Sequence, residues 1–506
     1  MQYDYVIIGS GLGGLECAYI LAKEGNSVCV LEKNRQFGGN LQIFSRDKSI
    51  FDTGVHYIGG LDEGQNLHQY FKYFNIIDKL KLRRMDENGF DKITFGNNPN
   101  EYPHAMGYDN FVEQLLTYFP KEKAGLRQYM DKLDEIRQAY PLYNVEYRKT
   151  EQFDLPFLNA NAKDFIESCT TDKTLQNVLA GTNSLYAGHG ESTPLYVHAL
   201  VCNSYIDSAW KCVDGGGQIA KYLVGNIKAM GGVVRNYSEV KRLQFGEGKE
   251  ATSVELITGE IIEGKTFIAN NHPAQLMDMI EEKGRLRGAY KNRIKSLKNS
   301  IANFTVHIVF KPESFPYLNH NYYHHETTDA WETLEYKEKD WPSGYAVFIP
   351  ATSKSNKWAD CMNMMSYMRM SEVEKWANTF NTVPKNKSNR NDDYQKFKTE
   401  RAEQLLDLLE RQFPDIRKHI QSYYTSTPLS YRDYIGTKDG SMYGIMKDSR
   451  DPLSSFITPR TKIPNLFLTG QNINLHGVLG VTLSSIVTCG QFLGMEYLVK
   501  KVKDAQ

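Results

Sequence analysis

The first forty residues alternate between short apolar runs and a helical repeat. Residues 5–8 form an apolar, β-rich run, which is typical of a strand buried in a parallel sheet. After a glycine-rich turn, apolar residues recur with helical spacing from Leu15 to Ala22, and Gly25 ends this helix. A second apolar run, residues 28–31, leads directly into Glu32. The pattern predicts a strand, a tight turn, a helix and a second strand, in that order.

The turn carries the glycine spacing of a dinucleotide-binding fingerprint. It reads Gly9-Ser10-Gly11-Leu12-Gly13-Gly14. Gly9 allows a sharp turn, Gly11 lets a pyrophosphate approach the backbone, and Gly14 lets the helix pack closely on the sheet. Glu32 can accept hydrogen bonds from ribose hydroxyls and disfavours a 2′-phosphate, so the fingerprint favours FAD or NAD over NADP. The alternative is a chance match in a glycine-rich loop, but the flanking strands and helix argue against it.

The rest of the chain divides into helical and strand-rich stretches. Residues 76–209 are mostly helical by pattern, residues 240–269 alternate like a β-meander, and residues 300–370 read as strands. Near the C-terminus, an apolar strand at 465–470 precedes a helix of small residues. We therefore expect an α/β fold (α+β overall) with a discontinuous Rossmann-like domain and an inserted substrate domain. The expected segments are 1–75, 210–290 and 440–506 for the first domain, and 76–209 and 291–439 for the substrate-binding or cap domain.

A second glycine sequence, residues 215–220, also fits the fingerprint by count. We interpret it as a chance match, because residues 209–213 before it are too short and too mixed for the first Rossmann strand. The chain thus carries one complete fingerprint and no separate NADPH domain. Electrons would have to come from a diffusible nicotinamide or another electron partner.

Composition narrows the remaining classes of function. The 506 residues suggest two or three domains, and 60 basic residues balance 60 acidic ones, so no long-range field favours nucleic acid. The 7 cysteines are scattered without metal-ligand spacing, which predicts no metal site and fits free thiols in a reducing compartment. We find neither a signal peptide nor 18 consecutive apolar residues, and expect a cytoplasmic protein. A peripheral membrane contact and the oligomeric state stay open.

Motifs beyond the fingerprint favour FAD over NAD. Gly38-Gly39 and residues 51–56 follow Glu32, and a plain NAD site needs neither. The stretch 4–60 resembles the phytoene desaturase and carotenoid isomerase superfamily of FAD-dependent oxidoreductases, most of all its all-trans-retinol 13,14-reductase (retinol saturase) branch. The segment 465–480 supports this resemblance independently, since the family has a closing strand, turn and helix there.

The resemblance implies which residues contact FAD. They are Gly9, Gly11, Leu12, Gly13, Gly14, Glu32, Lys33, Gly38, Gly39, Asn40, Gly54, His56, Val240, Asn270, Gly470, Gln471, Asn472, Gly477, Leu479, Gly480 and Val481. Asn270 has an equal alternative as an ordinary turn residue. The helix start near residues 478–482 would direct its dipole at the N1/O2 side of the flavin. The chain departs from the family at Gln471 and Asn472, where an acid is frequent.

The resemblance also implies redox chemistry or isomerisation at carbon–carbon double bonds of an apolar polyene or isoprenoid-like substrate. Saturation, desaturation and isomerisation stay open. His56 is the first candidate to transfer a proton, His476 the second, and Tyr431 and Tyr443 follow, although each could be a packed or hydrogen-bonded structural residue. Segments 153–160 and 172–186 are expected at the lip of the pocket.

Two other functions remain open. An amine-oxidase-like or protoporphyrinogen-oxidase-like flavin oxidase would share the fold, and a flavin-bound scaffold would need no chemistry. Methionines 362, 364, 368 and 370 share one face of a predicted strand, where they would form either a pliable substrate wall or ordinary core.

Overall fold

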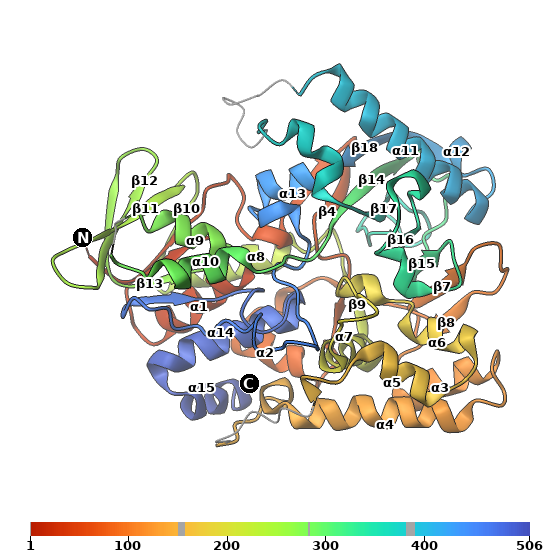
Figure 1. The fold of residues 1–506 in the computed structure, drawn as a ribbon, viewed down its shortest axis with the longest axis horizontal. Coiled ribbons are helices and arrows are strands. Elements are labelled where there is room, and N and C mark those ends of the chain that lie inside the picture. The colour runs from red at the N-terminus through yellow and green to blue at the C-terminus, as the bar shows by residue number, and fades with distance from the viewer. Residues whose placement is uncertain (1, 150–156, 282–283, 381–389) are drawn as a thin grey trace.

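Two seven-stranded sheets organise the computed structural model, which describes residues 2–149, 157–281, 284–380 and 390–506. Figure 1 shows the first sheet on the left and the second at the upper right, with a layer of helices along the lower right. This mixed arrangement confirms the predicted α/β fold class. No helix in these ranges is long and apolar enough to cross a membrane.

The first sheet joins three distant parts of the chain. Its strands are β1 (Tyr3–Ile8), β2 (Val28–Leu31), β10 (Val233–Arg235), β11 (Val240–Phe245), β12 (Ala251–Leu256), β13 (Ile261–Ala269) and β19 (Leu466–Leu468). The order is β10-β2-β1-β13-β12-β11, with β19 also paired to β13. Strands β1, β2, β10 and β19 run parallel, whereas β11, β12 and β13 form an antiparallel meander. The three segments expected for the Rossmann-like domain thus contribute to one sheet, while their boundaries stay a prediction.

Helices from both ends and from the middle of the chain cover this sheet. They are α1 (Leu12–Lys23), α8 (Gly217–Ala229), α14 (Gly477–Leu493), α9 (Pro273–Met279) and α10 (Gly288–Ser296). Helix α1 packs against α14 and α8, and α15 (Met495–Lys503) packs against α2 (Asn66–Tyr73). Figure 1 shows red α1 beside blue α14, so the two ends of the chain close one domain.

The second sheet is mostly antiparallel. Its order is β18 (Ile420–Ser426), β14 (Ala302–Phe310), β17 (Cys361–Met368), β16 (Gly344–Phe348), β15 (Asn321–His325), β7 (Asp91–Phe95) and β8 (Tyr102–His104). Helices α11 (Asp392–Gln412), α12 (Ile416–His419) and α13 (Pro428–Tyr434) lie close to it. Met362, Met364 and Met368 are fully buried in the core shared with α11, so the core reading of these side chains is the observed one.

Residues 76–209 contain more strand than the sequence indicated. Their helices are α3 (Tyr108–Leu116), α4 (Lys123–Ala139), α5 (Ala162–Cys169), α6 (Lys173–Ala180) and α7 (Leu195–Asp207), but β6 (Leu82–Arg84), β7 and β8 are present as well. Strand β7 pairs in parallel with β15, more than two hundred residues away. Such a partner leaves no local periodicity in the sequence, which explains the difference.

The second glycine sequence is not a nucleotide loop. Strand β9 (Ala209–Cys212), which precedes it, pairs antiparallel with β5 (Ile58–Gly59) and β6 in a small separate sheet. The N–H of Gly216 donates to Asp52 Oδ1 at 2.7 Å, which fixes this loop against the hairpin of β3 (Ile43–Arg46) and β4 (Ser49–Asp52). The interpretation as a chance match is confirmed.

A carboxyl group lies in the interface of α1 and α14. Glu16 is fully buried, and the Thr482 hydroxyl donates to its Oε1 at 2.7 Å. Burial raises the pKa of Glu16 to about 8 from its usual 4.5. The folded chain therefore keeps this proton over a pH range in which the unfolded chain has lost it. Stability from this group is greatest at low pH and falls as the pH rises towards 8.

The free energy of unfolding of the wild type should fall between about pH 6 and about pH 9 as Glu16 ionises. We expect Glu16→Gln to remove this part of the fall, which is on the order of a few kcal/mol. The amide keeps an oxygen for Thr482 and cannot ionise. Melting temperatures at both pH values check this, with Glu113→Gln on the exposed face of α3 as the matched control. An equally steep fall in the variant and the wild type would contradict the assignment.

Candidate functional site

A cavity of about 790 Å³ is lined from both large sheets and from the closing C-terminal segment. Of the residues predicted to contact a cofactor, all but Gly14 line it. His56, His476, Tyr431 and Tyr443 line it too, so the structure brings the four candidates for proton transfer to one place. Gly14 lies behind the loop, where a Cβ would collide with the Gly9 carbonyl oxygen. That position fits its predicted role in packing the helix on the sheet.

The fingerprint loop lies at the carboxyl end of β1. Gly9 has a φ of +96°, a conformation that side chains disfavour, and its N–H donates to the Leu31 carbonyl on β2. Glu32, at the end of β2, accepts hydrogen bonds from the Ser10 N–H at 3.1 Å and the Ser10 hydroxyl at 2.6 Å. A carboxylate has about four acceptor positions, so Glu32 can order this loop and still accept a ribose hydroxyl.

Three glycines surround the side chain of Asn270, which follows β13. A Cβ at Gly11 would lie 2.7 Å from Asn270 Nδ2, one at Gly13 3.0 Å from Asn270 Oδ1, and one at Gly470 2.5 Å from the same oxygen. Real Cβ atoms do not tolerate the first and last of these distances. Asn270 therefore holds the fingerprint loop against the end of β19, a more specific arrangement than that of an ordinary turn residue.

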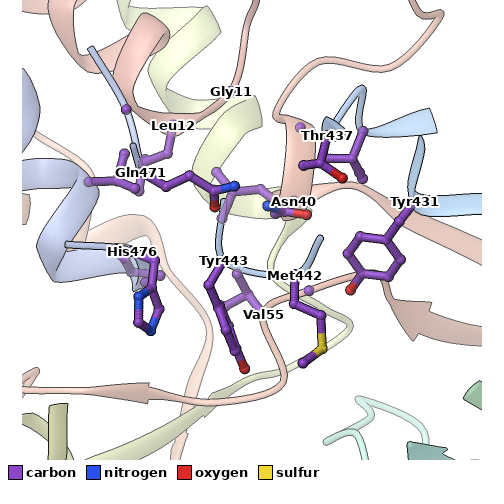
Figure 2. Close-up of a pocket in the computed structure, with 18 of the residues that line it drawn as sticks. Gly11, Leu12, Asn40, Val55, Tyr431, Thr437, Met442, Tyr443, Gln471 and His476 are labelled. Carbon is purple, nitrogen blue, oxygen red and sulfur yellow. The ribbon is translucent and has the colours of Figure 1, made fainter. Parts of the chain in front are cut away.

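The closing segment brings α14 to the cavity. The helix begins at Gly477, and Leu479, Gly480 and Val481 in its first turns line the cavity. In Figure 2 the side chains of Gln471 and Asn40 extend towards each other from opposite sides. Asn472 is less available, because its Oδ1 accepts the Ile445 N–H at 3.0 Å. Of the two amides that stand in place of the acid frequent in the family, Gln471 is thus the better placed for a ligand.

These features fit a dinucleotide with a flavin end. Two helices, α1 and α14, direct N-terminal turns at one cavity, and helix N-termini stabilise phosphate and other negative charge. The Gly38 N–H donates to the Ser10 carbonyl, and Gly38 and Gly39 both have positive φ. This second glycine pair lets the chain cross the fingerprint loop closely. The cavity is also lined by His56, Phe348 and Tyr443, which lie outside both loops.

Three of the four candidates for proton transfer use their polar atoms on the main chain. The Tyr431 hydroxyl donates to the Thr53 carbonyl at 2.6 Å, and the Tyr443 hydroxyl to the Ser184 carbonyl at 2.8 Å. His476 Nε2 lies 2.9 Å from the Leu185 carbonyl, and burial lowers the pKa of this ring to about 4. Figure 2 shows the His476 and Tyr443 rings side by side, with centroids 4.3 Å apart. These contacts favour a positioning role for all three.

His56 is different, because neither ring nitrogen has a hydrogen-bond partner in the described residues. Its ring stacks on Phe348 with centroids 4.4 Å apart. Burial lowers the pKa of His56 to about 3, and the charges of His307 and Lys211 act in the same direction. The ring is therefore neutral at neutral pH. It can exchange hydrogen bonds with a ligand, but it does not carry the extra proton of an imidazolium acid.

Three tyrosines around Phe348 are absent from the site residues predicted from the sequence. Tyr57, Tyr205 and Tyr323 line the same part of the cavity, and the Tyr57 and Tyr205 rings lie 4.3 Å apart. Tyr57 follows His56 directly, which was a usable signal. Tyr323 lies on β15, and only the pairing of distant strands brings it here. From the expected pocket lip, Ser184 and Leu185 line the cavity, whereas residues 153–156 lie outside the described residues.

Comparisons with known proteins agree with this geometry. Residues 7–74 match the model of an NAD(P)-binding Rossmann-like domain. The fold is similar to that of a putrescine oxidase, with a TM-score of 0.63, 14% identity and 99% of each chain covered. The chain therefore combines a Rossmann-like segment with a fold similar to that of the putrescine oxidase.

Comparisons of the amino-acid sequence find relatives that match nearly the whole chain. The chain is 25% identical to all-trans-retinol 13,14-reductase of Danio rerio, over 97% of this chain and 86% of that protein. It is 25% identical to prolycopene isomerase 2 of an Oncidium hybrid cultivar, over 96% of this chain and 83% of that protein. The predicted resemblance to the phytoene desaturase and carotenoid isomerase superfamily, in its retinol saturase branch, is confirmed.

We expect Gly11→Val to abolish loading of the flavin cofactor, because the new side chain would displace Asn270 and narrow the pyrophosphate approach. Overpacking of this kind costs typically about 1–3 kcal/mol. Flavin absorbance per protein after purification measures the effect. Gly225→Val is the matched control, since a Cβ at Gly225 of α8 would meet no atom within 4 Å. Normal flavin content in Gly11→Val would refute this placement of the pyrophosphate.

Proposed function

We propose that this protein is an FAD-dependent oxidoreductase that acts on carbon–carbon double bonds of an apolar polyene or isoprenoid-like substrate. The observation that supports it most is the continuity of one cavity. Its nucleotide end has the fingerprint loop and Glu32, and its other end has the aromatic side chains around Phe348. The relatives that reduce retinol or isomerise prolycopene, by their names, agree with such a substrate.

In this proposal the described residues hold FAD along the cavity. The start of α1 would bind the pyrophosphate, Glu32 would accept a hydrogen bond from the adenosine ribose, and the start of α14 would stabilise negative charge on the flavin. Gln471 and Asn40 supply amides between these two ends. When bound, FAD supplies hydride exchange at N5. A diffusible nicotinamide or another electron donor restores the reduced form, because the chain has one complete fingerprint.

The charge of the lining distinguishes a polyene from an amine. Four carboxylates line the cavity among the described residues, namely Glu32, Glu239, Asp278 and Glu281. All four belong to the elements around the first sheet, close to the nucleotide loop. Apolar surface comes from Leu67 on α2, Leu200 on α7 and Met365 on β17, none of which belongs to the first sheet. An ammonium group entering there would lose water without meeting a carboxylate on the wall, which is costly. We therefore favour a neutral, apolar substrate over an amine.

Anaerobic turnover with polyenes tests the proposal. FAD-loaded protein is reduced with dithionite and then mixed with all-trans-retinol or prolycopene. We expect one of them to reoxidise the flavin and give a product heavier by two hydrogens, or to isomerise without change of mass. The comparison arm is oxidised protein with putrescine and oxygen. Flavin reduction by the amine, without conversion of either polyene, would replace our proposal with an amine oxidase. If the protein binds FAD but none of these compounds alters the oxidation state of the flavin or is converted, the result would favour a flavin-bound scaffold without catalytic activity.

We expect His56→Phe to keep FAD and to lower kcat/KM by roughly 2- to 15-fold, the effect of about 0.5–1.5 kcal/mol for one lost hydrogen bond. The phenyl ring can keep the stack on Phe348, and a neutral ring transfers no net charge. Steady-state kinetics over a range of pH measures this. A loss of 10²- to 10⁴-fold with an altered pH profile would instead assign His56 the proton transfer.

A further inference from the structure

A short chain of hydroxyl groups leads from the cavity to a buried carboxyl. The hydroxyl oxygens of Tyr57 and Tyr323 lie 2.7 Å apart, and the Tyr57 hydroxyl donates to Asp91 Oδ2 at 2.8 Å. The other carboxyl oxygen, Oδ1, accepts from the Asn321 side-chain N–H at 2.8 Å. Both tyrosines line the cavity, whereas Asp91 lies behind them with no exposed surface.

The geometry joins three separate elements. Tyr57 precedes β5, Asp91 begins β7, and Tyr323 is central in β15. The parallel pairing of β7 with β15 places Asp91 opposite Asn321 and so fixes the carboxyl beside the tyrosines. Phe348, which stacks on His56, also contacts Tyr57 and Tyr323, with ring centroids 6.1 Å and 5.9 Å away. The hydroxyl chain is therefore part of the same wall as His56.

We propose that Tyr323 and Tyr57 relay a proton from the Asp91 carboxyl to the substrate, which makes Tyr323 the catalytic residue and Tyr57 and Asp91 the groups that supply it. This inference rests on the proposed function, and names the proton source for that same site.

The transfer balances as a shift along the chain. Before the transfer the protonated Asp91 Oδ2 donates to the Tyr57 oxygen, and the Tyr57 hydroxyl donates to the Tyr323 oxygen. Asp91 gives its proton to Tyr57, Tyr57 gives its own to Tyr323, and Tyr323 gives its own to one carbon of the double bond. The hydrogen bond from the Tyr57 hydroxyl to Asp91 Oδ2 is the arrangement of the carboxylate that remains. The neighbouring carbon receives a hydride from reduced FAD, so the alkene gains two hydrogens and two electrons. Asp91 is left as a carboxylate, which the Asn321 N–H and the Tyr57 hydroxyl stabilise. Water restores its proton between turnovers, and an electron donor such as a nicotinamide restores the flavin.

Asp91 is suited to hold this proton. Burial raises its pKa to about 7, while the Asn321 and Tyr57 hydrogen bonds and the charge of Lys211 act against that rise. At neutral pH the group can therefore be found in both protonation states. The sequence predicts Tyr431 and Tyr443 as candidates instead. Their hydroxyls donate to main-chain carbonyl oxygens, which have no proton to give.

Substitution of Tyr323 tests the relay. We expect Tyr323→Phe to bind FAD normally and to accept electrons from dithionite, but to saturate the polyene 10²- to 10⁴-fold more slowly, the usual range for loss of an acid. The matched control is Tyr70→Phe, which removes a buried hydroxyl bonded to the Leu142 carbonyl outside the cavity. The control should turn over like the wild type. Wild-type rates in Tyr323→Phe would overturn the relay.

The pH dependence gives a second readout. Asp91 must be protonated, so the rate of saturation should be highest below about pH 7 and fall as the pH rises through the pKa of Asp91. Asp91→Asn should be slow and lose this decline. The other titratable groups packed around Asp91 are Lys211 on β9, His104 on β8, Cys202 and Tyr205 on α7, and the two tyrosines. A decline that persists in Asp91→Asn would assign it to one of these groups and overturn the role of Asp91.

Infrared difference spectra between low and high pH need no substrate, and so separate the relay from the proposed function. We expect the protonated-carboxyl band that disappears as the pH rises to contain a component from Asp91, which is missing in Asp91→Asn, while the component from Glu16 stays and is missing only in Glu16→Gln. If the wild type converts no polyene, the proposed function fails, but this band still supports Asp91 as a proton store. An unchanged band in Asp91→Asn would overturn the relay whatever the turnover experiment shows.

Discussion

The close packing of Asn270 against Gly11, Gly13 and Gly470 is the constraint on which the site depends. The three glycines come from two ends of the chain, and the side chain between them leaves no room for a Cβ at two of the positions. The contact fixes the fingerprint loop relative to the end of β19. It thereby fixes the start of α1 relative to the start of α14, which lies seven residues beyond Gly470. A cofactor that extends from one helix to the other needs this distance to be constant.

Features that depend on local spacing could be predicted from the sequence. A few neighbouring residues are enough to predict three features: the glycine turn, the acid at the end of β2 and the small-residue helix near the C-terminus. The second glycine sequence could be set aside for the same reason, since the strand before it was wrong for its role. Features that depend on strand pairing could not be predicted. The pattern over residues 76–209 predicts mostly helix and misses β7, because the parallel partner of β7, β15, is far away in sequence.

The same distinction holds within the site. Recognisable motifs predict four candidates for proton transfer: His56, Tyr431, Tyr443 and His476. All four line the cavity. The motifs do not predict the hydrogen bonds of these side chains. Three of the four bond to main-chain carbonyl oxygens. The hydroxyl chain to Asp91 uses residues from three elements and has no motif. Whether a polar group is free or already bonded is a property of the packed structure, and it decides the chemistry more than residue type does.

The pairing of β19 with β13 has a consequence for the biosynthesis of the protein. Strand β19 and helix α14 are synthesised long after β1 and β13, yet they complete the sheet and the cavity that the first part of the chain begins. Contacts between such distant segments form slowly, and the part of β13 that pairs with β19 has no partner there until β19 has been synthesised. A nascent chain of this protein is therefore exposed to aggregation for most of its synthesis. A ligand that binds only the completed site would stabilise the native state by mass action, so cellular flavin supply should influence how much folded protein accumulates.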